Sequence, residues 1–183
     1  MTTDYEDVRA FTLDESDQED LLRTQNECTF VWSTRDGWPV GVIMSFVWRD
    51  GKVWLTSSVQ RKRVKAVARD PRVSIIVSGA GTPIGPGKTV TLKGRCTLHD
   101  DPETAAWFYP ALAKAVFPDN DVRQQRFIAL LDSPGRVIFE VTPVASITHD
   151  VEKLAKSASR ARRAAEGGQG AVGGQGAVDE QIS

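Results

Sequence analysis

The sequence has few of the residues that build disulfide frameworks, metal centres or membrane spans. Its 183 residues include two cysteines and two histidines. No apolar run approaches the roughly 18 residues of a transmembrane helix, and the first residues are acidic, unlike a secretory signal region. Because Cys28 and Cys96 each fall inside a predicted strand, they indicate buried free thiols. We therefore expect a cytoplasmic protein with no membrane partner.

The scarcity of histidine also restricts the chemistry. A zinc centre or a Ser-His-Asp triad would need His99 or His149, and no recognisable ligand spacing surrounds either residue. Both lie at the ends of predicted strands, so we interpret them as surface residues. The sequence thus predicts no metal site and leaves the catalytic residues unknown. A net charge of −1 and the lack of a recognised motif argue against a nucleic-acid partner.

What the sequence does contain is a series of short segments rich in β-branched and aromatic residues, separated by turn signals. Asp-Gly pairs at 36–37 and 50–51 are typical of hairpin turns. The segment 40–48 is apolar on both faces, which favours a barrel interior on one side and a helix or second subunit on the other. Six strands are predicted, at residues 29–33, 40–48, 52–57, 72–78, 89–98 and 136–148.

Helices are predicted around this sheet. They cover residues 14–23, 61–69 and 119–131, and a further helix begins at Asp101, with Pro110 kinking or splitting it. The predicted fold class is therefore mainly β with flanking helices, built on a six-stranded antiparallel sheet.

The composition divides the chain into three parts. A single globular domain is predicted for residues 14–149, after an N-terminal extension of residues 1–13. Residues 150–183 are basic and then rich in Gly, Ala and Gln, with the sequence GGQGAV twice in tandem. Such a segment buries little apolar surface, so it predicts a flexible tail.

A Gly-Lys-Thr tripeptide at 87–89 ends a Gly/Pro-rich loop and superficially matches a nucleotide-binding P-loop. That motif needs a glycine five residues before Gly87, where this chain has Thr82, and a helix after the threonine. Residues 90–96 are instead typical of a strand. The segment is therefore interpreted as a hairpin or lid loop.

A better phosphate site lies where the third predicted strand meets the helix 61–69. The strand ends in three hydroxyl residues and the helix opens with cations, namely Thr56, Ser57, Ser58, Arg61, Lys62, Arg63 and Lys65. A helix amino end already carries about +0.5 charge, so cations there lose on the order of 0.3–1 kcal/mol each unless an anion is close. Hydroxyls and free backbone N–H groups point to the same ligand. A solvated basic helix face is the alternative.

The succession of strand, Thr-Ser-Ser, basic helix start and Arg-Asp-Pro-Arg-Val-Ser-Ile at 69–75 resembles the pyridoxamine 5'-phosphate oxidase-like family of FMN-binding split barrels. Gly-Trp-Pro at 37–39 and Lys-Gly-Arg-Cys at 93–96 add to the resemblance, which covers roughly residues 14–149. Within that family the chain is most similar to the flavin- or deazaflavin-dependent reductases.

The resemblance implies a homodimeric, six-stranded split β-barrel with the cofactor held between subunits. It implies that Arg61, Lys62 or Arg63 holds the cofactor phosphate, helped by residues 56–58, and that Met44 and Ser45 border the ring. The implied activity is hydride transfer between reduced deazaflavin (F420) or FMN and an unsaturated small organic substrate. The surplus of cations slightly favours F420. A non-catalytic cofactor carrier or storage protein remains the alternative.

Overall fold

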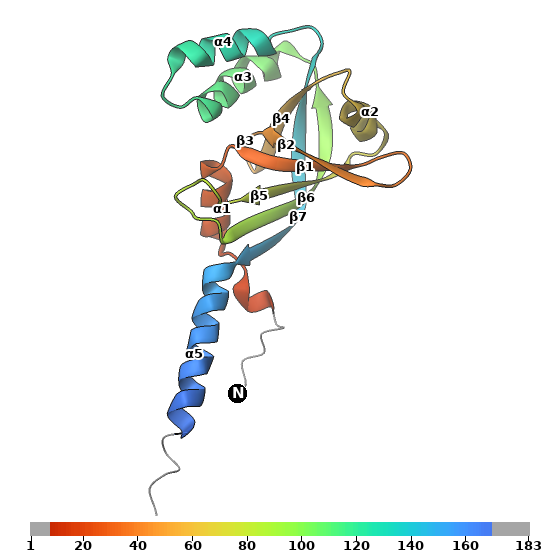
Figure 1. Ribbon diagram of the computed structural model, residues 1–183. Coiled ribbons are helices and arrows are strands. Elements are labelled where there is room, and N and C mark those ends of the chain that lie inside the picture. The colour runs from red at the N-terminus through yellow and green to blue at the C-terminus, as the bar shows by residue number, and fades with distance from the viewer. Residues whose placement is uncertain (1–7, 170–183) are drawn as a thin grey trace, which may run out of the picture.

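The computed structural model describes residues 8–169, so parts of the expected N-terminal extension and of the GGQGAV repeats lie outside the described residues. Within this range the expected fold class, mainly β with flanking helices, is confirmed. All strand pairings are antiparallel, and the sheet curls into a half-barrel (Figure 1). Its strands follow the order β2-β1-β5-β6-β7-β4-β3. Their bounds are β1 (Glu27–Ser33), β2 (Pro39–Ser45), β3 (Val47–Arg49), β4 (Lys52–Ser58), β5 (Arg72–Ser78), β6 (Lys88–His99) and β7 (Arg136–Asp150).

The sheet has seven strands where the sequence predicted six. The single strand expected at 40–48 is divided at Phe46, whose side chain is fully buried. On one side of Phe46, β2 pairs with β1, and on the other β3 pairs with β4. Since β2 and β3 are the two edges of the sheet, the chain passes from one edge to the other at this residue. The apolar pattern on both faces therefore reflects one bent segment that serves two edges.

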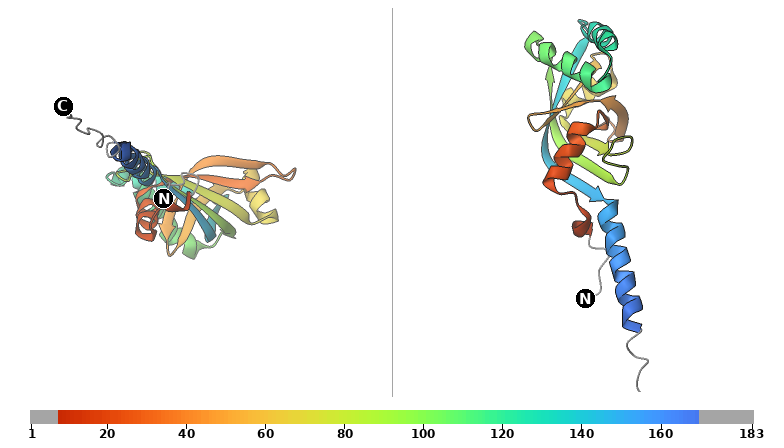
Figure 2. Two further views of the ribbon diagram at one scale, coloured as in Figure 1. Left: turned by 90° about the horizontal axis from the view of Figure 1, so that it is seen from below. Right: turned by 90° about the vertical axis from the view of Figure 1, so that its left-hand side faces the viewer.

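The helices gather at the two ends of the half-barrel. A hairpin of α3 (Pro102–Val116) and α4 (Asp121–Leu131) lies at one end, and α5 (Val151–Gln169) extends away from the other (Figure 2). The remaining helices are a 3-10 turn at Val8–Phe11, α1 (Glu15–Thr24) and α2 (Lys62–Arg69). Helix α3 continues through Pro110, where the sequence predicted a kink or a break. No helix among the described residues is long and apolar enough to span a membrane.

Two apolar clusters hold these elements together. The larger fills the barrel interior with fully buried side chains that include Phe30, Leu55, Ile75 and Phe139. Both cysteines belong to this cluster as free thiols, as predicted, and burial raises the pKa of each to about 12. The smaller cluster lies between the sheet and the α3–α4 hairpin, around Trp54, Phe108, Leu112, Leu131 and Ile138.

The start of the expected flexible tail is helical. The Asp150 carboxylate accepts hydrogen bonds from the backbone N–H groups of Glu152 at 2.9 Å and Lys153 at 3.3 Å, which caps α5. Alanine, lysine and arginine are strong helix formers, so the capped segment propagates as a helix. Lys153 Nζ also contacts Asp14 and the carbonyl of Thr12, which ties the first turn of α5 to the chain before α1.

The Gly-Lys-Thr segment opens β6, so a strand follows it and the P-loop interpretation is excluded as expected. Lys88 Nζ forms an ion pair with Asp17 at 3.0 Å. This lysine therefore has a structural partner on α1.

Candidate functional site: the junction of β4 and α2

The junction is built by a strand, a tight turn and a short helix. Strand β4 pairs with β7 up to Ser58, and the backbone N–H of Val59 then donates to Gly135 O at 2.9 Å. The N–H of Arg61 donates to Ser58 O at 3.0 Å, and α2 begins at Lys62. Ala66 and Val67 are buried in the barrel core. This packing fixes the helix so that its basic face is turned outward.

Strand alternation separates the three hydroxyls that the sequence analysis grouped together. Ser57 is 2% exposed and lies on the barrel side of β4, as do Val53 and Leu55. Thr56 and Ser58 lie on the other face, where Thr56 Oγ1 donates to Val137 O at 3.0 Å. Ser57 Oγ accepts a hydrogen bond from Arg63 Nε at 3.0 Å. Ser57 is therefore the hydroxyl that the structure joins to the cationic cluster.

Within the part of the chain that the structure describes, the cations of the junction have no carboxylate partner. Arg63 is half-buried, and both burial and the nearby charge of Arg61 lower its pKa. Arg61, Lys62 and Lys65 are exposed, and among residues 8–169 their side chains make no hydrogen bond or ion pair. Helix α2 has no acidic residue in its first turn and no side-chain cap. The junction thus concentrates uncompensated positive charge at a helix amino end, where backbone N–H groups are free.

Met44 and Ser45 are the last residues of β2. Met44 is half-buried against the barrel core, beside the same cluster that receives Val64 of α2. Ser45 points to the opposite face. Within the described part of the chain, neither side chain is joined to the junction by a hydrogen bond or an ion pair. The structure brings Met44 to the core that supports α2, and it leaves Ser45 on the outer surface of the sheet.

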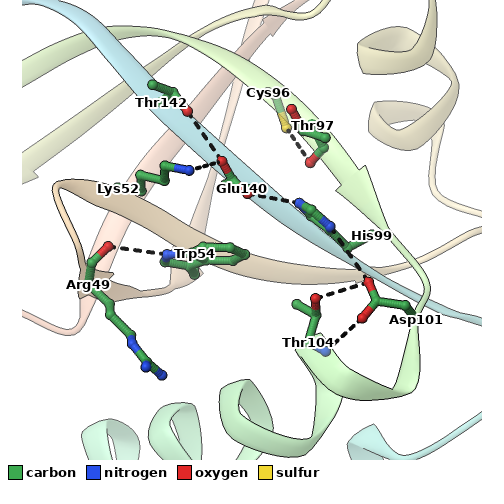
Figure 3. A network of polar contacts seen from close by, with 10 residues as sticks. All are labelled: Arg49, Lys52, Trp54, Cys96, Thr97, His99, Asp101, Thr104, Glu140 and Thr142. Carbon is green, nitrogen blue, oxygen red and sulfur yellow. Dashed lines mark hydrogen bonds and ion pairs between the residues drawn. The ribbon is translucent and has the colours of Figure 1, made fainter.

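A second polar cluster, which sequence reasoning missed, lies where β6 meets α3 (Figure 3). His99 Nε2 lies 2.9 Å from Glu140 Oε2, and its Nδ1 lies 3.6 Å from Asp101 Oδ2. Lys52 Nζ donates to the other oxygen of Glu140. Asp101 accepts from the backbone N–H and the hydroxyl of Thr104 at 2.7 and 2.9 Å, and so caps α3. His99, expected on the surface, is therefore a half-buried member of this network.

Within this network, hydrogen bonds and opposite charges compensate the burial of Glu140. Burial would raise the pKa of Glu140, but the hydrogen bonds and charges of Lys52 and His99 outweigh it, so the pKa is lowered. The Trp54 ring lies over His99, with ring centroids 5.7 Å apart, and meets Trp107 edge-on. The network therefore holds its carboxylates ionised with partners from four elements.

The curled antiparallel half-barrel is the kind of fold that the resemblance implied, and a comparison with family models agrees. The family described as pyridoxamine 5'-phosphate oxidase matches residues 15–150. The chain belongs to this family, as the resemblance indicated. No curated protein matches the sequence.

Solved structures share the fold at low sequence identity. A conserved hypothetical protein of Mycobacterium tuberculosis is 18% identical, with a TM-score of 0.69 over 80% of this chain and 90% of that one. A protein named F420 reductase is 22% identical, with a TM-score of 0.56 over 70% and 94%. An FAD-binding protein of Mesorhizobium loti is 19% identical, with a TM-score of 0.55 over 75% and 94%.

Proposed function

We propose that the protein is an oxidoreductase that transfers a hydride between reduced F420 or FMN and an unsaturated small organic substrate. The observation that carries the proposal is the uncompensated charge at the junction. Arg63 is half-buried with another cation beside it and a serine hydroxyl as its hydrogen-bond partner. Such an arrangement is costly unless an anion completes it. A cofactor phosphate fits that requirement.

The residues divide into binding and positioning roles. Arg61, Lys62 and Lys65 bind the anion as exposed cations, and the first N–H groups of α2 add donors. Ser57 positions Arg63, because its hydroxyl is buried and accepts from Nε. Met44 offers an apolar wall, and Ser45, Thr56 and Ser58 are the further residues that we place at the cofactor. When bound, the flavin or deazaflavin supplies the hydride transfer, and the protein supplies orientation and exclusion of water.

The cationic junction suits F420 better than FMN. Four cations surround the helix start, more than one phosphate monoester requires, and a structural neighbour carries the name F420 reductase. The absorbance spectrum of the freshly purified protein tests the choice. A yellow protein that releases FMN would contradict the preference for F420.

The outer face of the sheet supports the expected homodimer. Ile43, Thr29, Ile76, Thr91 and Ile147 lie side by side across five strands. The three isoleucines are 40 to 70% exposed. Three exposed isoleucines, alternating with two half-buried threonines, are suited to an interface, and we propose a second copy of the chain as the partner of this row. Replacing Ile76 with lysine should shift the mass measured by light scattering from dimer to monomer.

A non-catalytic carrier or storage protein is the competing function. Both candidates bind cofactor at the junction, so binding does not separate them. Turnover with quinones or enones does, because a carrier gives no rate above that of the free cofactor. The free, buried cysteines are consistent with a reducing compartment such as the cytoplasm for either function.

The site is tested by Arg63→Ala and Lys62→Ala in a fluorescence titration with F420 and with FMN. Each lost charge-assisted contact should weaken binding by roughly 1.5–3 kcal/mol, which is about 10- to 150-fold. Arg126→Ala is the matched control, since Arg126 is an exposed cation on α4. Equal affinities for all three variants and the wild type would remove the junction as the cofactor site.

A further inference from the structure

A cavity of ≈ 700 Å³ lies between the α3–α4 hairpin and the adjoining end of the sheet. Its volume falls in the usual range for small-molecule sites, and its wall is about equally polar and apolar. The apolar lining comes from both helices and from β7, and includes Ala105, Ala106, Ile128 and Ile138. The cofactor proposal uses neither this cavity nor its polar lining residues.

The polar network of Figure 3 forms one side of this cavity. His99 and Asp101 line it, yet both are already engaged, because each ring nitrogen of His99 faces a carboxylate and both oxygens of Asp101 accept from Thr104. Their partners hold these side chains in place. His99 and Asp101 therefore form a fixed part of the cavity wall, and we expect other lining residues to contact a ligand.

Three charged lining residues, Arg136, Asp132 and the exposed Asp100, form no hydrogen bond or ion pair through their side chains within residues 8–169. Arg136 opens β7 and is half-buried, and Asp132 follows the end of α4. Among residues 8–169, neither side chain forms an ion pair or a hydrogen bond, and they do not pair with each other. A half-buried guanidinium without an acceptor favours a bound carboxylate, which it can hold in two-point contact.

Tyr109 lines the same cavity. The residue is 7% exposed, and its hydroxyl interacts electrostatically with both Arg136 and Asp132. Burial raises the pKa of Tyr109, and Asp132 adds to the rise, while Arg136 and a hydrogen bond with Thr56 oppose it. The phenol therefore stays neutral at physiological pH. The cavity thus presents a cation, a neutral hydroxyl and an anion next to an apolar wall.

We propose that this cavity binds a small zwitterion of the amino-acid class, with its carboxylate at Arg136, its ammonium group at Asp132 and an apolar side chain against Ala105, Ala106 and Ile138. A free carboxylic acid satisfies Arg136 alone, and an amine satisfies Asp132 alone. A zwitterion supplies a partner to Arg136 and to Asp132 at once.

The cavity adjoins the cofactor junction through the β4–β7 ladder and through the hydrogen bond of Tyr109 with Thr56. Arg136 is the register partner of Ser58, and Gly135 O accepts from Val59 N–H. The cationic residues of the two sites lie on different elements, since Arg136 is on β7 and the cluster is on α2 and the turn before it. Binding at the cavity can therefore be measured while cofactor binding serves as an independent readout.

The test is calorimetric titration of the full chain with L-phenylalanine, 3-phenylpropionate and phenethylamine as probes. We expect saturable binding of L-phenylalanine and affinities at least about tenfold lower for the two singly charged probes, each of which loses one charge-assisted contact. Saturable binding of all three with equal affinity, or of none, would overturn the proposal.

Variants locate the site. Arg136→Gln should weaken L-phenylalanine binding about tenfold and leave phenethylamine unaffected. Ala106→Trp should abolish binding of L-phenylalanine by filling the cavity, and it keeps the proposal testable if Arg136→Gln does not fold. Arg126→Gln, an exposed change on α4 outside the lining, is the control. Cofactor affinity should stay unchanged in every variant, so failure here is separable from failure of the cofactor site. Wild-type affinity in both cavity variants would contradict the assignment.

Discussion

Two of the junctions at which a strand of the half-barrel leads into a helix carry charge in opposite ways. Where β6 meets α3, a carboxylate caps the helix, and Lys52 and His99 are partners of Glu140. Where β4 meets α2, the helix start carries Lys62 and Arg63, has no side-chain cap and has no acidic residue in its first turn.

The difference separates structural charge from charge kept for a ligand. The α3 junction is complete without any added molecule, because Asp101, His99, Glu140 and Lys52 satisfy one another. The α2 junction is incomplete within residues 8–169, because its cations meet a serine hydroxyl and each other. Family membership and local electrostatics therefore point to the same place for an anion.

The largest expected effect comes from breaking the complete junction. Glu140→Gln removes the charge that Lys52 and His99 share, so the free energy of unfolding should fall by about 1–2 kcal/mol, given that Lys52 is partly exposed. Urea unfolding at neutral pH measures the loss. Asp119→Asn, an exposed change between α3 and α4, should stay within about 0.5 kcal/mol of the wild type. Cofactor affinity should not change in either variant.

The next largest effect comes from adding a carboxylate to the cationic α2 junction. Lys65→Glu places a carboxylate four residues after Arg61 on the basic face, so it competes with a bound anion. Cofactor affinity in a fluorescence titration should fall about tenfold, while the free energy of unfolding rises by no more than about 0.5 kcal/mol. Arg126→Glu makes the same charge change on α4 and should leave the affinity intact. An equal loss of cofactor affinity in both variants would mean that the affinity depends only on the net charge of the protein.

A smaller effect tests the cap that distinguishes the two helices. Asp101→Ala removes both acceptors of Thr104 and should lower the free energy of unfolding by about 1 kcal/mol. Asp101→Asn keeps a capping oxygen and should recover most of that loss. Replacing Arg61, the residue at the same position before α2, with alanine should cost almost nothing, because its side chain caps nothing. Thermal unfolding of the three variants compares the junctions directly, and a loss in Arg61→Ala as large as in Asp101→Ala would erase the distinction.

The strands and turns could be predicted because their signals are local. Asp50 and Gly51 adopt positive φ, as their turn requires, and segments rich in β-branched and aromatic residues located the strands, with β2 and β3 predicted as one. The division at Phe46 could not be predicted, because a segment apolar on both faces has the same pattern whether it pairs with one neighbour or with two. That choice depends on which strands form the edges, which is a property of the whole sheet.

The two junctions differ in the same way in how far the sequence could predict them. The cations before and within α2 are adjacent in sequence, so their concentration was visible, and strand alternation would also have separated Ser57 from Thr56 and Ser58. The α3 junction was not visible, because Glu140 lies 41 residues beyond His99 and Lys52 lies 88 residues before Glu140. Only the pairing of β7 with both β6 and β4 brings these three side chains together.

The smallest effect concerns pH and the same carboxylate. The folded pKa of Glu140 is lowered, since Lys52 and His99 outweigh the effect of burial. A carboxylate with a lowered folded pKa contributes stability above its unfolded-state value, and this contribution is lost as pH falls through the folded value. The gap in unfolding free energy between wild type and Glu140→Gln should therefore be full at about pH 7 and narrow below about pH 4.3, the ordinary value for glutamate. Urea unfolding of both proteins across that range measures the gap. A gap that widens as pH falls below about 4.3 would show that Glu140 is not held ionised by its two partners, and the contrast between the junctions would then rest on α2 alone.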